Sequence, residues 1–181
     1  IGVISGFGSV IVNGVRYETT DAAVVVDDQA ATEDALRVGY KVRITGSRSD
    51  DGSSGVAQLI EYESDIEGPI ESIDTVARTL VVVGQLVRVR NDTLFDDDLP
   101  VDSIEAFTIG DFVEVSGFLG GDDSVQATRI ELEDDRDEIE VTGFVRNLDD
   151  VGFTFTIGGL TVDYSSAQLE DFDGGVIRNG D

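Results

Sequence analysis

Two acidic stretches have the residue types and the spacing to bind a hard cation. Acidic residues stand at every second position in each stretch, as Glu61, Glu63, Asp65 and Glu67, and as Glu131, Glu133, Asp135 and Asp137. Every second side chain of an extended chain lies on the same face. Carboxylates gathered in this way are the ligands that Ca²⁺ prefers, at about 2.3–2.6 Å. These residues are therefore candidate metal ligands, with Ca²⁺ as the candidate ion.

The same stretches also fit a solvated strand face. On that interpretation the carboxylates face water, while Tyr62 and Ile66, or Leu132, turn towards the core. Neither stretch has the ligand spacing of an EF-hand loop. Both interpretations stay open, and the solvated face is the simpler one.

Few residue types suited to catalysis are present. The chain has no Cys and no His, which excludes thiol chemistry, disulfides and the commonest general base. Glycoside hydrolysis needs two carboxylates in a cleft, normally beside aromatic rings, and the chain has no Trp. The glycine-rich segment Gly6-Phe7-Gly8 precedes no helix and no GK[ST] motif, so it predicts a turn or bulge rather than a phosphate loop. We expect a protein that is not an enzyme and that has no cofactor, unless Ca²⁺ binds.

The charge of the chain is strongly negative. Thirty-eight acidic residues against 12 basic ones give a net charge of −26. Such a polyanion repels nucleic acid and anionic membrane surfaces, so neither is an expected partner. Salt screens this self-repulsion, since the Debye length falls to about 3 Å at 1 M, and a saline or extracellular setting is consistent with the charge. No apolar run approaches the roughly 18 residues of a membrane span, so we expect no membrane insertion by this segment.

The strands that are expected to carry these residues belong to a small β-unit. The sequence repeats this unit three times, over residues 1–64, 65–136 and 137–181. In the first unit, strands ending at Val12 and starting at Val15 flank Asn13-Gly14, a strong signal for a type I′ hairpin. A third apolar run follows, and then come a helical turn, an alternating strand and a last strand, expected at 22–26, 32–37, 40–46 and 56–60.

The second and third units repeat this order. Gly39 and Gly46 bracket an alternating strand in the first unit, and Gly110 and Gly117 bracket its counterpart in the second. The second hairpin turn is expected at residues 84–85, and the third at residues 158–159 between strands 153–157 and 160–164. The third helical turn is expected at 165–170, and no counterparts of the last two strands follow it.

A meander of three strands, a short helical turn and two more strands is the order of the five-stranded oligonucleotide/oligosaccharide-binding (OB) barrel. The sequence therefore predicts an all-β protein of three tandem OB-like barrels, with the turn between strands 3 and 4 and the third unit incomplete. A β-sandwich with the same strand count is the alternative.

The segments Gly6–Tyr17, which contains GFGS and VNG, and Val38–Gly46 resemble a bacterial family of tandem domains of unknown function. Ile109–Gly117 and Ala127–Glu131 carry the same signature in the second unit, whereas the full GFGS-x-x-V-N-G form occurs only in the first. The resemblance implies OB-like repeats and a secreted protein or lipoprotein of the cell envelope. It implies no catalytic residues.

These observations favour a non-catalytic structural or adhesive protein outside the cytoplasm. A third unit short of two strands exposes a sheet edge that can pair with another chain, as in a surface filament or array. The missing strands come either from a continuation of the chain or from a neighbouring subunit, since we expect the sequence to be part of a longer or processed chain. The alternative function is a module that binds Ca²⁺ or glycans on the barrel faces or at the repeat junctions.

Overall fold

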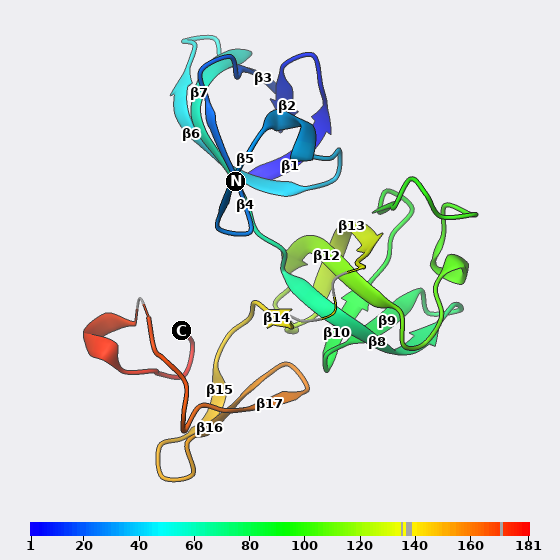
Figure 1. The fold of residues 1–181 in the computed structure, drawn as a ribbon, viewed down its shortest axis with the longest axis vertical. Helices are drawn as coiled ribbons and strands as arrows, with labels where there is room; N and C mark the ends of the chain where they lie inside the picture. The colour runs from blue at the N-terminus through cyan, green and yellow to red at the C-terminus, as the bar shows by residue number, and fades with distance from the viewer. Residues whose placement is uncertain (135, 137–138, 171) are drawn as a thin grey trace.

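The computed structural model describes residues 1–134, 136, 139–170 and 172–181. It shows three groups of strands that follow one another along the chain (Figure 1). The helical elements of this part of the chain are short 3-10 turns, and none is long and apolar enough to cross a membrane. The predicted all-β class is confirmed.

The first unit is a seven-stranded sheet that closes on itself. Its strands are β1 (Gly2–Gly6), β2 (Val10–Val12), β3 (Val15–Glu18), β4 (Ala23–Val26), β5 (Gln29–Ala31), β6 (Lys41–Arg48) and β7 (Ser54–Tyr62). Because β3 pairs with β7, the strands β1, β2, β3, β7 and β6 form a closed barrel. The β4–β5 hairpin, which was expected only as one apolar run, extends the sheet beyond β7.

The second unit repeats this closure. Its strands are β8 (Ile66–Asp74), β9 (Thr79–Val82), β10 (Gln85–Arg88), β11 (Leu94–Phe95), β12 (Phe112–Leu119) and β13 (Val125–Leu132). The parallel pairing of β10 with β13 closes the barrel, as β3–β7 does in the first unit. Closure of both sheets distinguishes the predicted barrel from the sandwich alternative. A further strand, β14 (Glu140–Val141), pairs with β8.

The third unit is a three-stranded sheet in the order β15 (Arg146–Asp149), β16 (Thr154–Ile157) and β17 (Leu160–Asp163). Its core is small. Val145, Phe155 and Ile177 are the buried members, whereas the closed barrels bury further side chains from β6–β7 and from β12–β13.

Among the described residues, each unit has a 3-10 turn, which in the two barrels comes before the strands β6 and β12. The turns are η1 (Glu33–Ala35), η2 (Ile104–Ala106) and η3 (Asp173–Gly175). The first lies within the predicted segment 32–37, and the second lies within residues 101–107, the counterpart that the repeat predicts in the second unit. The prediction for the third unit was wrong, since residues 165–170 form no helix and the turn follows three residues later.

The hairpin turns lie at the predicted residues in the first and third units, at 13–14 and 158–159. Asn13 and Gly14 have φ of 52° and 76°, as a type I′ turn requires. In the second unit the turn is formed by Val83 and Gly84 rather than by residues 84–85, and Gln85 begins β10. Val83 has φ of 46°, which a β-branched residue rarely adopts, so pairing of the flanking strands overrides its local preference.

The two glycines that were predicted to bracket the alternating strand have different functions: the first precedes the strand, whereas the second lies inside it, in β6 or β12. The first has positive φ and, with the residue after it, exchanges two backbone hydrogen bonds with a residue that lies in, or directly before, the first strand of its unit. These residues are Ile4 with Gly39 and Tyr40, Ile70 with Gly110 and Asp111, and Val145 with Gly180 and Asp181. The second lies at a bulge where two strands approach closely: a Cβ on Gly46 would lie 2.1 Å from the Val56 oxygen. The spacing of these glycines is therefore a property of the barrel.

Candidate functional site

The first acidic stretch spans the junction between the first two units instead of forming one strand face. Glu61 lies in β7, Glu67 lies in β8, and Glu63 and Asp65 lie in the connection between these strands. Glu63 is exposed, but Asp65 is only 5% exposed. The expected solvated face is therefore interrupted at Asp65, because the chain turns there from one barrel into the next. Tyr62 and Ile66 are buried as that interpretation expected.

Asp65 joins the first barrel, the second barrel and the segment after β14 through its side chain and backbone. Its carboxylate forms an ion pair with Lys41 and accepts a hydrogen bond from the Gly117 amide at 2.8 Å. Its own amide donates to the Val115 oxygen at 2.9 Å, and its oxygen accepts a bond from the Thr142 amide at 2.8 Å. Burial raises the pKa of the Asp65 carboxyl, and Lys41 and the Gly117 amide offset part of this effect. The contacts identify Asp65 as a fixed structural link.

A cleft of about 210 Å³ opens beside this link. Its lining residues are Ile1, Lys41, Val42, Arg43, Glu61, Glu63, Ser64, Asp65 and Thr142. The Ser64 hydroxyl is buried and has no hydrogen-bond partner. The cleft is smaller than the roughly 300–1,000 Å³ of typical ligand pockets, and three acids of the first stretch, but not Glu67, are among its lining residues.

The second acidic stretch is described only in part. Asp135 and Asp137 lie outside the described residues. Glu131 lies in β13, and the Glu133 amide donates to the Phe112 oxygen at 2.9 Å. In the ranges that the structure covers, no three acidic side chains form a group that could hold a metal ion. Calcium binding by the two stretches stays a prediction.

A row of glutamates crosses the second sheet, which the sequence did not reveal. Glu131, Glu114, Glu67 and Glu140 occupy paired positions on β13, β12, β8 and β14. Their sequence separations carry no periodic signal, because cross-strand neighbours come from four different strands. The pairing places like charges side by side, which is unfavourable when all of them are ionised.

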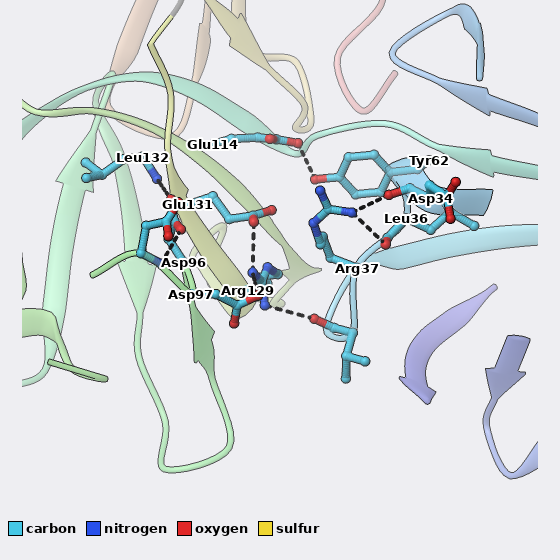
Figure 2. A network of polar contacts seen from close by, with 12 residues as sticks. Asp34, Leu36, Arg37, Tyr62, Asp96, Asp97, Glu114, Arg129, Glu131 and Leu132 are labelled. Atoms are coloured by element: carbon cyan, nitrogen blue, oxygen red, sulfur yellow. Dashed lines mark hydrogen bonds and ion pairs between the residues drawn. The ribbon is translucent and has the colours of Figure 1, made fainter. Parts of the chain in front are cut away.

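Glu114 reduces this repulsion by favouring its neutral form. Burial raises its pKa to about 7, and the carboxylates of Asp27, Glu131 and Glu133 add to this increase. The Tyr62 phenol donates a hydrogen bond to Glu114 and opposes part of it (Figure 2). A carboxyl with this pKa gains or loses its proton near neutral pH.

Arg129 is a buried cation at the same junction. Its guanidinium forms an ion pair with Glu131 at 2.8 Å and another with Asp97 at 3.5 Å, and it donates to the Val38 oxygen of the first unit at 3.3 Å (Figure 2). The Lys41 amide donates to the Ser116 hydroxyl at 2.8 Å. Buried polar groups thus link the first two units directly, which favours one fixed arrangement of the barrels.

The second and third units are linked by their hairpin tips. The Gln85 side-chain amide donates to the Ile157 oxygen at 2.7 Å, and the Gly159 amide donates to the Gly84 oxygen at 2.9 Å. A Cβ on Gly84 would lie 2.7 Å from the Leu160 nitrogen, so only glycine allows this approach. The third sheet is therefore held against the second barrel by backbone as well as side chain.

The third sheet has two open edges. In the closed barrels, the corresponding edges are covered by the barrel's own strands. In the first unit, β6 pairs with β1 and β7 pairs with β3, so that the two strands bridge the meander. Within the described part of the chain, β15 and β17 each pair only with β16. The unit thus has the backbone donors and acceptors for further strand pairing.

One comparison with known proteins gives a match. The family model described as a domain of unknown function, DUF5666, matches residues 1–61 and again residues 67–131. No curated protein and no solved structure matches the chain. The two matched segments contain the two closed barrels almost completely, which confirms a tandem repeat for the first two units. Because these matches cover more than half of its residues, the chain belongs to the DUF5666 family.

Proposed function

We propose that this chain is a non-catalytic structural or adhesive protein of the cell envelope or the extracellular space. In this role it holds its β-units in a fixed row and associates with further β-strands through the third sheet, as a subunit of a surface filament or array. The observation that carries the proposal is the third sheet itself, with edges at β15 and β17 that no described strand covers.

The repeat junctions support this role because they fix the position of the third sheet. Asp65 and Arg129 connect the first two units, and Gln85 connects the second to the third. Several buried polar contacts between units oppose independent motion of the barrels. A surface for association is thereby held at a constant distance from the first unit.

The strong negative charge supports the same role. A net charge of −26 opposes unspecific aggregation of chains that carry open sheet edges. Pairing between backbone groups is directional and survives this repulsion best where salt screens the charges. A setting with substantial salt, without nucleic acid or inserted membrane segments as partners, fits this role.

Sedimentation velocity over a wide range of protein concentration tests this role. We expect reversible association that strengthens with added salt. Thr161 stands at the position of Arg16, whose amide donates to the Ser53 oxygen at 3.2 Å in the first barrel. Thr161→Pro removes the corresponding donor and should weaken association, whereas Thr161→Ala keeps it and should not. A monomer at every concentration would contradict the proposal.

The alternative function is a module that binds Ca²⁺ or glycans. One feature favours it, since Glu61, Glu63 and Asp65 line the same cleft. Calorimetric titration with Ca²⁺, repeated with Glu63→Gln and Glu133→Gln, separates the alternatives. A saturable heat that either variant removes would favour the binding module.

A further inference from the structure

The first two units show which element the third sheet lacks. In each of them, a β-hairpin pairs with both edges of a three-stranded meander. In the first barrel, the β6–β7 hairpin lies between β1 and β3, the outer strands of the meander. In the second barrel, the β12–β13 hairpin lies between β8 and β10 in the same way. The first strand of each hairpin runs antiparallel to the first strand of the meander, and the second runs parallel to the third. A single added strand covers one edge, whereas a hairpin covers both.

The backbone of the third unit is set for the same closure. Val145 exchanges with Gly180 and Asp181 the two backbone bonds that Ile4 exchanges with Gly39 and Tyr40. In the first unit, β6 begins at Lys41, directly after this contact. Counting from the same contact, Gly143 corresponds to Gly2, which pairs with Val42. The start of the missing pairing is thus already positioned.

The opposite edge follows the same register. Counting from the hairpin turns, Thr161 corresponds to Arg16 and Asp163 to Glu18, which pair with Ser54 and Val56 of β7. Both edges of the third sheet therefore match one hairpin in one register.

The small core of the third unit shows which side chains such a hairpin must bring. Val162 is half-buried, whereas Val87 at the corresponding position of the second barrel is completely buried. The residues that complete the first core from its hairpin are Val42, Ala57, Ile60 and Tyr62. A partner hairpin must carry apolar side chains at these positions, because only one of its faces meets the core. They alternate along the strands except between Ala57 and Ile60, where the pairing of β6 with β7 has a bulge.

Charge favours the first of the two hairpins as the template. Its first strand, β6, carries Lys41, Arg43 and Arg48, whereas β12 carries Glu114 and no basic residue. The edges of the third sheet carry the acids Asp149 and Asp163 against a single base, Arg146, so their net charge is negative. A hairpin with basic residues on its first strand therefore suits this unit better than an acidic one.

We infer that the third unit is a receptor for one β-hairpin of the β6–β7 kind, donated by a polypeptide segment outside residues 1–181. The inference rests on the proposed association through the third sheet and names the partner as a two-stranded element with alternating apolar residues. The chain's own two hairpins are paired within their barrels and are not the donors.

A fused hairpin tests the inference, since an isolated two-stranded hairpin is only marginally stable in water. A copy of residues 41–63 is added directly after Asp181 of the full chain, where the register continues as it does after Tyr40. Amide hydrogen exchange is then measured at Gly143, Thr161 and Asp163. We expect exchange slower by roughly tenfold or more than in the unmodified chain, together with protection of the added strands.

The matched control carries Val42→Asp and Ile60→Asp in the added copy only, which leaves its length and turn unchanged but removes the apolar face. This control should give no protection. The inference is overturned if the unaltered copy stays unprotected, or if both copies protect equally. It is also overturned if the unmodified chain dimerises with loss of protection in β6–β7, because that result would identify exchange of its own hairpin.

Sedimentation of the fused chain separates this inference from the proposed function. A docked hairpin should cover both edges and leave the fused chain monomeric while the unmodified chain associates. Protection of the added hairpin in a chain that never associates would contradict the proposed function and support the inference. Association of the unmodified chain without docking of the added hairpin would support the proposed function and contradict the inference.

Discussion

The Tyr62 phenol of β7 donates a hydrogen bond to the Glu114 carboxyl of β12, and this contact joins the first barrel to the second. The Tyr62 ring is stacked on Tyr40, with centroids 3.8 Å apart and planes 8° from parallel. An acidic group is therefore held in a largely buried junction beside the carboxylates of Asp27, Glu131 and Glu133. Its protonation should affect the stability of this junction.

The first prediction concerns pH. The pKa of Glu114 is raised from 4.5 to about 7 in the folded chain, so folding favours the protonated form. The stabilisation linked to this proton is complete below about pH 4.5 and is lost as the pH rises through about 7. Glu114→Gln keeps a neutral acceptor for Tyr62 and should remove this dependence.

Urea unfolding of both proteins across this pH interval, at constant ionic strength, measures the effect. The free energy of unfolding of the unmodified chain should fall relative to that of the variant by on the order of 2 kcal/mol. Parallel pH profiles for the two proteins would show that Glu114 titrates normally.

The second prediction concerns Asp65. Asp65→Asn leaves Lys41 without its ionic partner and weakens the bond from the Gly117 amide. Because Lys41 is partly exposed and can turn to solvent, we expect a loss of about 1–3 kcal/mol, less than for a fully buried charge. The exposed neighbour Glu63 provides the control, and Glu63→Gln should change the free energy of unfolding by less than about 0.5 kcal/mol.

A double-mutant cycle with Lys41→Met refines this test. If the ion pair determines the loss, the double variant should be more stable than the sum of the single effects indicates. Additive losses would place the effect of Asp65 in its bonds to the second unit instead.

The third prediction concerns the second bracketing glycine. A Cβ on Gly117 would lie 2.5 Å from the Gln126 oxygen, whereas nothing lies within 4 Å of a Cβ on Gly121. Gly117→Ala should therefore destabilise the second barrel by about 1–3 kcal/mol, and Gly121→Ala should be nearly neutral. Thermal unfolding of the two variants measures the difference, and equal melting temperatures would contradict the close approach of β12 and β13.

The fourth prediction concerns calcium. The structural proposal expects no saturable heat when Ca²⁺ is titrated into the chain, because Asp65 is occupied by Lys41 and the Gly117 amide. Glu63→Gln should behave like the unmodified protein. Saturable binding that is lost in this variant would assign the cleft between the first two units to the cation.

Local chemistry made the repeats predictable. Asn13 and Gly14 specify a turn by their backbone preferences, and Gly39 and Gly46 mark the start of β6 and the bulge within it. Such signals lie within a few residues of one another, so they are visible without tertiary structure. The turn at Val83 was misplaced by one residue because pairing of β9 with β10 overrides the preference of a β-branched residue.

The junction could not be predicted in the same way. The sequence placed Asp65 on a solvated face, but the change of direction between barrels buries it against Gly117, which lies 52 residues away. The row that includes Glu114 depends on the register of four strands and has no local pattern. Contacts of this kind arise from the packing of units, so only the structure reveals them.

Amide hydrogen exchange of the full chain at low and high protein concentration tests the role of the third sheet most directly. Association through the open edges predicts that the amides of Thr161 and Asp163 exchange more slowly at high concentration, while those of β2 and β9 do not change. Exchange at Thr161 and Asp163 that is independent of concentration, in a chain that sedimentation shows to be associated, would place the contact elsewhere and contradict the account.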